Sequence, residues 1–129
     1  MSFSVWLQWF HEGEPAPVAV AALREAFGAL ASEVDGRLRV AGAELEGVEP
    51  DALSTAAIEL RRPSSAPEFW SAVHACIALP GGVAYWPESP PLVASSGASE
   101  HLPPDLLEVL GAAREVRDGA ELHQLLRSI

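Results

Sequence analysis

A strand with apolar side chains on both faces, at residues 3–10, is the feature that most constrains the fold of this chain. Successive side chains of a strand point to opposite sides, so every second residue shares a face. One face carries four large apolar side chains: Phe3, Val5, Leu7 and Trp9. Trp6 and Phe10 make the other face partly apolar too. We therefore predict an interior strand of a sheet that is covered on both sides.

The rest of the chain alternates between helical and extended patterns. Helical spacing of apolar residues, with proline near several starts and glycine after one end, predicts helices at 17–30, 64–79, 103–110 and 118–129. Short apolar runs bounded by glycine and proline predict strands at 37–40, 56–60, 83–86, 92–94 and 114–116. A glycine-first turn at Gly42-Ala43 predicts a hairpin that pairs Val40 with Leu45 and Arg39 with Glu46.

This order of elements predicts an α+β fold in a single domain, residues 1–129, with a mixed or antiparallel sheet and three to four helices. The first part matches a ferredoxin-like arrangement to which one hairpin strand has been added. A less regular sheet with helices on one face is the alternative.

Composition favours a bacterial protein of the cytoplasm. The chain has no lysine and no asparagine, and all eight of its basic residues are arginine, which indicates a genome of high G+C content. A single cysteine excludes an intramolecular disulfide and a cysteine-based metal site. The first residues lack the features of a signal peptide, and no apolar stretch is long enough to span a bilayer.

The chain is strongly acidic, with a formal net charge of −10. The 51 residues between Arg62 and Arg114 contain no positive side chain but several acidic ones. Such a charge repels nucleic acid and anionic lipid and attracts basic proteins. We therefore expect a protein partner with a basic surface, and neither nucleic acid nor membrane.

Histidine, cysteine and acidic residues occur in the chain, but not in the patterns of known catalytic or metal-binding motifs. His11, Glu12 and Glu14 lack the second histidine, one helical turn away, of catalytic zinc motifs, which favours a solvated loop. His74 and Cys76 are two residues apart on a predicted helix and point in different directions, which favours a small buried cysteine. No phosphate-binding loop and no nucleophile elbow is present. We predict no catalytic, metal-binding or cofactor-binding residue and no cofactor.

A binding surface is the remaining candidate for a site. Trp86 adjoins a rigid proline-rich loop that also carries Glu88, and we predict that its ring is partly exposed. The predicted interface consists of an aromatic residue, a histidine and exposed acids: Trp86, Glu88, Glu100, Glu108, His11 and Glu12.

The opening residues 1–10, followed by Gly13-Glu14-Pro15-Ala16, resemble a family of small uncharacterised bacterial proteins that begin with an aromatic strand and a Gly-Glu-Pro-Ala turn. The resemblance continues at Pro91-Leu92-Val93, at residues 102–105 and at residues 118–122. It implies no biochemical role. In size and charge, members of this family are similar to the immunity proteins of bacterial toxin systems.

Three hypotheses about function follow. The first is a non-enzymatic, acidic protein-binding module, of which an immunity protein for a basic toxin is one form. The second is a small-molecule-binding protein or small enzyme with a pocket near Trp9, Tyr85 and Trp86. The third is a homodimer held together by exposed aromatic side chains. The sequence leaves open whether the chain is an enzyme, although it favours a non-enzymatic role.

Overall fold

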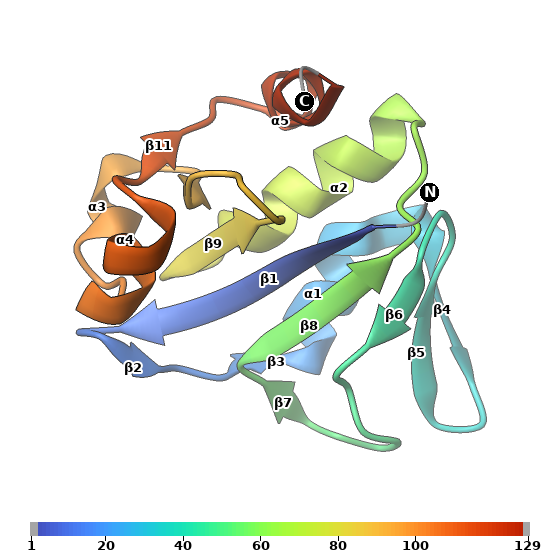
Figure 1. Cartoon of the computed structure of the whole chain (residues 1–129). Helices are drawn as coiled ribbons and strands as arrows, with labels where there is room; N and C mark the ends of the chain where they lie inside the picture. Colours follow the sequence, from blue (N-terminus) through green and yellow to red (C-terminus); the bar gives the residue numbers. More distant parts are fainter. Residues whose placement is uncertain (1–2, 128–129) are drawn as a thin grey trace.

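The aromatic amino-terminal segment forms the central strand of a sheet in the computed structural model, which describes residues 3–127 (Figure 1). The strands are β1 (Ser4–His11), β2 (Glu14–Pro15), β3 (Val18–Ala19), β4 (Ala31–Val34), β5 (Arg37–Val40), β6 (Glu44–Glu46), β7 (Ser54–Thr55), β8 (Ala57–Arg61), β9 (Gly82–Tyr85), β10 (Leu92–Val93) and β11 (Arg114–Glu115). The helices are α1 (Val20–Phe27), the 3₁₀ turn η1 (Gly28–Leu30), α2 (Pro67–Ile77), α3 (Ser96–Ser99), α4 (Pro104–Leu110) and α5 (Gly119–Arg127). The predicted α+β class is confirmed.

The main sheet has the strand order β11-β10-β9-β1-β8-β6, with β2 paired to β1 at one end. The four strands β9, β1, β8 and β6 are antiparallel to their neighbours. Each helical crossover, through α1 and through α2, joins two strands that have one other strand between them. This is the split β-α-β arrangement of the ferredoxin-like core. The additional strands are β10 and β11 at one edge, the short β3–β7 pair and the separate β4–β5 hairpin.

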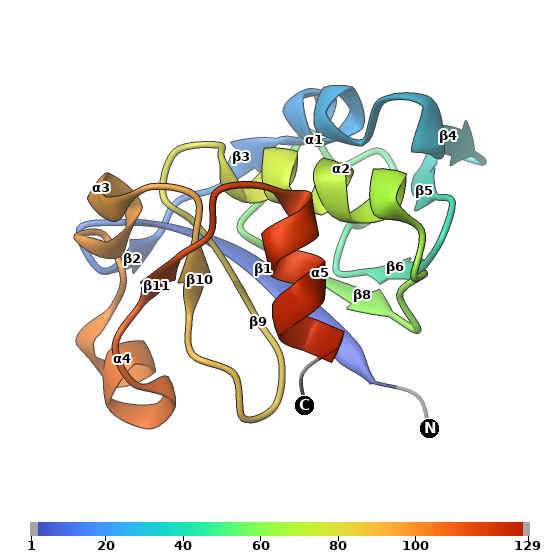
Figure 2. The same cartoon turned by 90° about the horizontal axis from the view of Figure 1, so that it is seen from above.

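Helices cover the two faces of the sheet unequally. On one face α1 and α2 pack against the central strands and α5 packs against α2, whereas α4 lies on the opposite side (Figure 2). The larger core contains Val5, Leu7 and Trp9, each with no exposed surface. A smaller core on the opposite face surrounds Phe10 and Val83. The predicted interior strand is confirmed, and its second face is covered only near its carboxyl end.

The predicted hairpin at Gly42-Ala43 is wrong. In the structure β5 pairs with β4 through the two-residue turn Asp35-Gly36, and β6 pairs with β8. Asp35 and Gly36 both have positive φ, 52° and 75°, as the tight turn of a two-residue hairpin requires. Asp-Gly is a strong hairpin signal, so this turn could have been found in the sequence.

Two helix boundaries also differ from prediction. Helix α1 begins at Val20 rather than at residue 17, because Val18 and Ala19 pair with β7 instead. Residues 96–99, where no helix is predicted, form the short helix α3. The predicted start of the last helix agrees with the structure, in which an Asp118 carboxylate oxygen accepts a hydrogen bond from the Glu121 backbone N–H at 2.9 Å and caps α5. No helix in residues 3–127 is long and apolar enough to cross a bilayer.

Candidate binding surfaces

The turn between β1 and β2 is bound to the segment that joins α3 and α4. The backbone N–H of Glu12 donates to Nδ1 of His101 at 3.1 Å, and the N–H of Gly13 donates to the His101 carbonyl at 2.9 Å. The rings of His11 and His101 stack, with centroids 4.9 Å apart. Two of the predicted interface residues, His11 and Glu12, therefore lie beside the segment that carries a third, Glu100.

Exposed carboxylates without an arginine partner gather at this end of the molecule. It is formed by the β1–β2 turn, α3 and α4, and we call it the acidic end. Five exposed acids belong to it: Glu12, Glu14, Glu100, Asp105 and Glu108. In the described structure the acids that pair with arginine lie elsewhere: Glu33, Glu44, Glu46, Glu59 and Glu121. Glutamates of β6 and β8 are thus paired with arginine, whereas the five acids of the acidic end, like some exposed acids elsewhere, are not.

A mostly apolar hollow of about 420 Å³ lies between α4 and the outer face of the sheet. We call it the α4 groove. Phe10 and, from α4, Leu106, Val109 and Leu110 supply its apolar walls, and Val109 is 80 % exposed. Asp105 borders the same groove. An apolar groove bordered by a carboxylate suits a ligand that has both an apolar and a cationic part.

An aromatic pair continues the α4 groove along the sheet. The rings of Trp6 and Tyr85 stack with centroids 6.0 Å apart, and the Tyr85 hydroxyl donates to Oε1 of Gln8 at 3.0 Å. Partial burial raises the pKa of Tyr85 above its usual value. These side chains sit on the part of the outer face that α4 leaves uncovered.

Two of the predicted interface residues lie apart from this end. Trp86 is only 3 % exposed, so the expected partial exposure of its ring is wrong. Its position is fixed because its backbone N–H donates to the hydroxyl of the buried Ser89 at 2.9 Å. Glu88 is exposed, but it follows the end of β9 that points away from the acidic end. Trp9 is also buried, which leaves Tyr85 alone of the three residues expected around a pocket.

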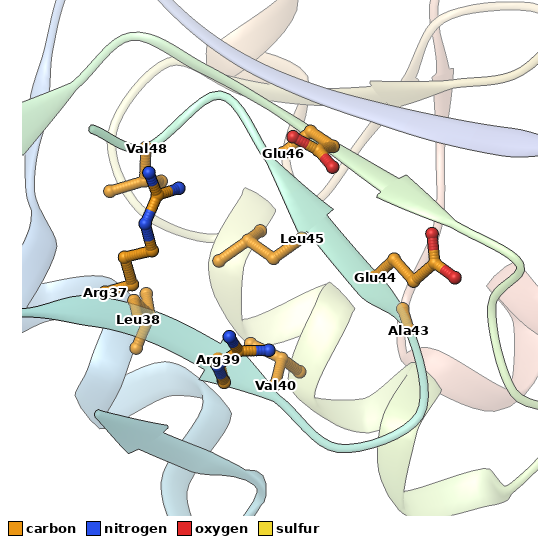
Figure 3. Close-up of a pocket in the computed structure, with 9 residues that line it drawn as sticks. All are labelled: Arg37, Leu38, Arg39, Val40, Ala43, Glu44, Leu45, Glu46 and Val48. Carbon is orange, nitrogen blue, oxygen red and sulfur yellow. The ribbon is translucent and has the colours of Figure 1, made fainter. Parts of the chain in front are cut away.

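A second hollow, of about 400 Å³, separates β5 from β6 (Figure 3). We call it the β5–β6 cleft. Its floor is apolar and comes from Leu38, Val40, Leu45 and Val48. Its two rims carry opposite charges, with Arg37 and Arg39 on β5 and Glu44 and Glu46 on β6. A hairpin at Gly42-Ala43, as predicted from the sequence, would pair the two strands that form the rims and leave no cleft between them.

His74 and Cys76 are held by structural contacts, with Cys76 in the core and His74 partly buried. Cys76 has no exposed surface, and burial raises the pKa of its thiol to about 12, so it is a poor nucleophile at neutral pH. Nε2 of His74 lies 3.0 Å from the carbonyl oxygen of Val116. Within residues 3–127, no group of three or more histidine, cysteine or acidic side chains is arranged to hold a metal ion.

No protein-family model, curated protein or solved structure matches this chain, so the family resemblance drawn from its motifs stays a prediction.

Proposed function

We propose that the protein is a non-enzymatic binding module that uses its acidic end to hold a basic segment of another protein. The observation that carries this proposal is an apolar groove bordered by Asp105, at an end of the molecule where four further exposed carboxylates also have no arginine partner. An immunity protein that neutralises a basic toxin is one form of this role.

The two parts of the surface act on different steps of binding. Uncompensated carboxylates attract a basic partner over about one Debye length, 8–10 Å, and so accelerate encounter. The α4 groove then buries apolar side chains, and each fully buried aliphatic side chain contributes roughly 1.5–3 kcal/mol before the costs of association. The exposed Val109 is the clearest candidate for such a contact.

The binding probe is a peptide of alternating arginine and leucine. A peptide of alternating arginine and serine, which has the same charge but no apolar side chains, is the control. Replacing Glu12, Asp105 and Glu108 by their amides should weaken binding of the arginine–leucine peptide roughly five- to tenfold in dilute salt, because each exposed charge pair contributes about 0.2–1 kcal/mol. Val109→Ser should reduce the ratio between the affinities for the arginine–leucine and arginine–serine peptides, because it removes an apolar contact that only leucine can use. Isothermal titration calorimetry measures both effects.

A matched control removes the same charge elsewhere. Glu25, Glu49 and Glu115 are exposed and lie outside the acidic end, and none forms an ion pair in the described structure. Converting all three to glutamine should weaken binding less than twofold. Equal losses in the two triple variants would show that only net charge matters and would refute the assignment of the site. Sedimentation of the free protein at several concentrations tests self-association as the competing use of this surface.

A small-molecule-binding role is the second candidate, because the volume of the α4 groove lies within the roughly 300–1,000 Å³ of ligand sites. Gln8, Asp105 and the Tyr85 hydroxyl are its polar groups. Tryptamine, a planar aromatic cation, tests this role by its effect on tryptophan fluorescence. Trp6 should report binding, since it is partly exposed whereas Trp9, Trp70 and Trp86 are buried.

A further inference from the structure

The contact between the β1–β2 turn and the segment that joins α3 and α4 depends on a lone pair of His101. The backbone N–H of Glu12 can only donate a hydrogen bond, so Nδ1 of His101, which lies 3.1 Å away, accepts it. Nδ1 is an acceptor only in the neutral imidazole, because both ring nitrogens carry protons in the imidazolium ion. Protonation of His101 is therefore incompatible with this hydrogen bond.

A second histidine adds to this dependence on protonation. The rings of His11 and His101 stack with centroids 4.9 Å apart. Two imidazolium ions at this distance repel each other, whereas two neutral rings do not. His11 is exposed and His101 is partly exposed, so protons from the solvent reach both rings. Acid therefore opposes the contact in two ways, because it removes the acceptor on His101 and places two positive charges side by side.

The other titratable side chains around this contact are acidic. Glu12 lies 3.9 Å from Nε2 of His11, and the neighbouring elements add Glu14, Glu100 and Asp105. No arginine in residues 3–127 pairs with any of these four carboxylates. Carboxylates accept charge-assisted hydrogen bonds from an imidazolium ion. A protonated His101 therefore has alternative partners close by when it loses the Glu12 N–H.

Other contacts confine the change to the position of the β1–β2 turn. Leu102 is only 5 % exposed and packs with Phe10 in the smaller core, which anchors the start of α4. The turn is a two-residue hairpin connection with positive φ at Glu12 and Gly13, 49° and 83°. Both segments thus keep their own structure when the hydrogen bond between them is lost.

We propose that His101 is a pH-sensitive clasp whose neutral imidazole holds the β1–β2 turn against the α3–α4 connection and whose protonation releases the Glu12 N–H. For partner binding, this inference rests on the proposed function. The acidic end has five exposed carboxylates, and protonation of His11 and His101 adds two positive charges to it. A basic segment is then held at neutral pH and released in mildly acidic solution, where imidazole changes its charge.

NMR spectroscopy of the free ¹⁵N-labelled protein between pH 8 and pH 5 tests the clasp without a partner. The Glu12 amide proton should move upfield as its hydrogen bond is lost, with the same midpoint as the carbon-bound protons of the His101 ring. His101→Asn is the matched variant, because asparagine Oδ1 accepts at the position of Nδ1 and does not titrate. It should remove most of the Glu12 shift, whereas His11→Asn should retain it.

Two results of this titration would overturn the clasp. One is a Glu12 amide that does not follow the His101 ring, because the hydrogen bond would then be insensitive to protonation. The other is a Glu12 shift in His101→Asn as large as that of the wild type, because the shift would then originate from another titrating group.

Isothermal titration calorimetry with the arginine–leucine peptide tests the consequence for binding. The affinity should fall about fivefold from pH 7.5 to pH 5.5 in dilute salt, because the acidic end gains two positive charges. Replacing both His11 and His101 by asparagine should remove most of this fall. His123→Gln, which removes a partly exposed histidine of α5, should leave it unchanged.

The two experiments separate the clasp from the proposed function. A fall in affinity that is the same in the double variant as in the wild type would overturn the regulation of binding by these histidines. Absence of peptide binding at both pH values would refute the proposed function together with its regulation, but not the clasp, which the NMR titration decides by itself.

Discussion

Cys76 should make the protein lose stability as the pH rises through the alkaline range, and Cys76→Ala should remove that loss. The thiol has no exposed surface, and burial raises its pKa from 9.0 to about 12. Desolvation is the cause, because the interior disfavours the thiolate. The folded protein therefore keeps the thiol proton after the unfolded chain has released it. The stabilisation is complete below about pH 9 and disappears as the pH approaches 12.

The magnitude follows from the two pKa values. At about pH 10.5 the unfolded thiol is almost fully ionised and the folded thiol is almost fully protonated, so linkage lowers the free energy of unfolding by about 2 kcal/mol relative to neutral pH. The composition leaves few other ionisations that could change the stability in this pH range. The chain has no lysine, one tyrosine and one cysteine, so few other groups titrate between pH 9 and 11. Tyr85 is present in both proteins, so its contribution cancels from the comparison.

Urea unfolding of the wild type and of Cys76→Ala at about pH 7.5 and pH 10.5, with a phosphine reductant present, measures the difference. The variant should be less stable at neutral pH because it loses buried atoms, and the gap between the two proteins should narrow by about 2 kcal/mol at the higher pH. A gap that stays constant with pH would refute the reasoning, because it would mean that the thiol ionises equally easily in the folded and unfolded states.

Two predictions concern hydrogen bonds to side chains. Ser89→Ala should lower the free energy of unfolding by about 1–3 kcal/mol, because it leaves the buried N–H of Trp86 without its acceptor, whereas Ser99→Ala, at an exposed bond, should cost less than about 1 kcal/mol. Asp118→Ala should cost about 1 kcal/mol by removing the cap on the Glu121 N–H, and Asp118→Asn should restore most of it. Chemical denaturation measures both changes in the free energy of unfolding. A decrease for Ser99→Ala as large as that for Ser89→Ala would contradict the idea that burial makes the Ser89 bond the more important one.

Local sequence patterns predicted most elements because each was specified by its own residues. The alternation around Val5 and Leu7 identified the central strand, and Gly111, with a φ of 93°, ends α4 as predicted. The main error in pairing arose where two local signals competed. The predicted turn lies at Gly42, whereas the structure forms the hairpin at Asp35-Gly36, which is the stronger hairpin signal.

The candidate sites were less predictable because exposure and proximity depend on packing between distant segments. Trp86 adjoins a polar, proline-rich loop in sequence, yet its ring packs into the larger core. His11 and His101 are far apart along the chain, and they meet because the β1–β2 turn packs on the segment before α4. Nothing in the spacing of these residues indicates that they are neighbours.

The sequence by itself determined the α+β class, the central strand, the uniform negative charge and the absence of a local catalytic motif. These properties depend on periodicity and composition, which are already present in the unfolded chain. Only the tertiary structure decided which acidic side chains pair with arginine and which strands pair with each other. Both depend on which distant segments meet. Arg61 and Arg62 pair with the glutamates of β6, and the hydrogen bonds of Ala41 and Gly42 to other segments prevent β5 from pairing with β6.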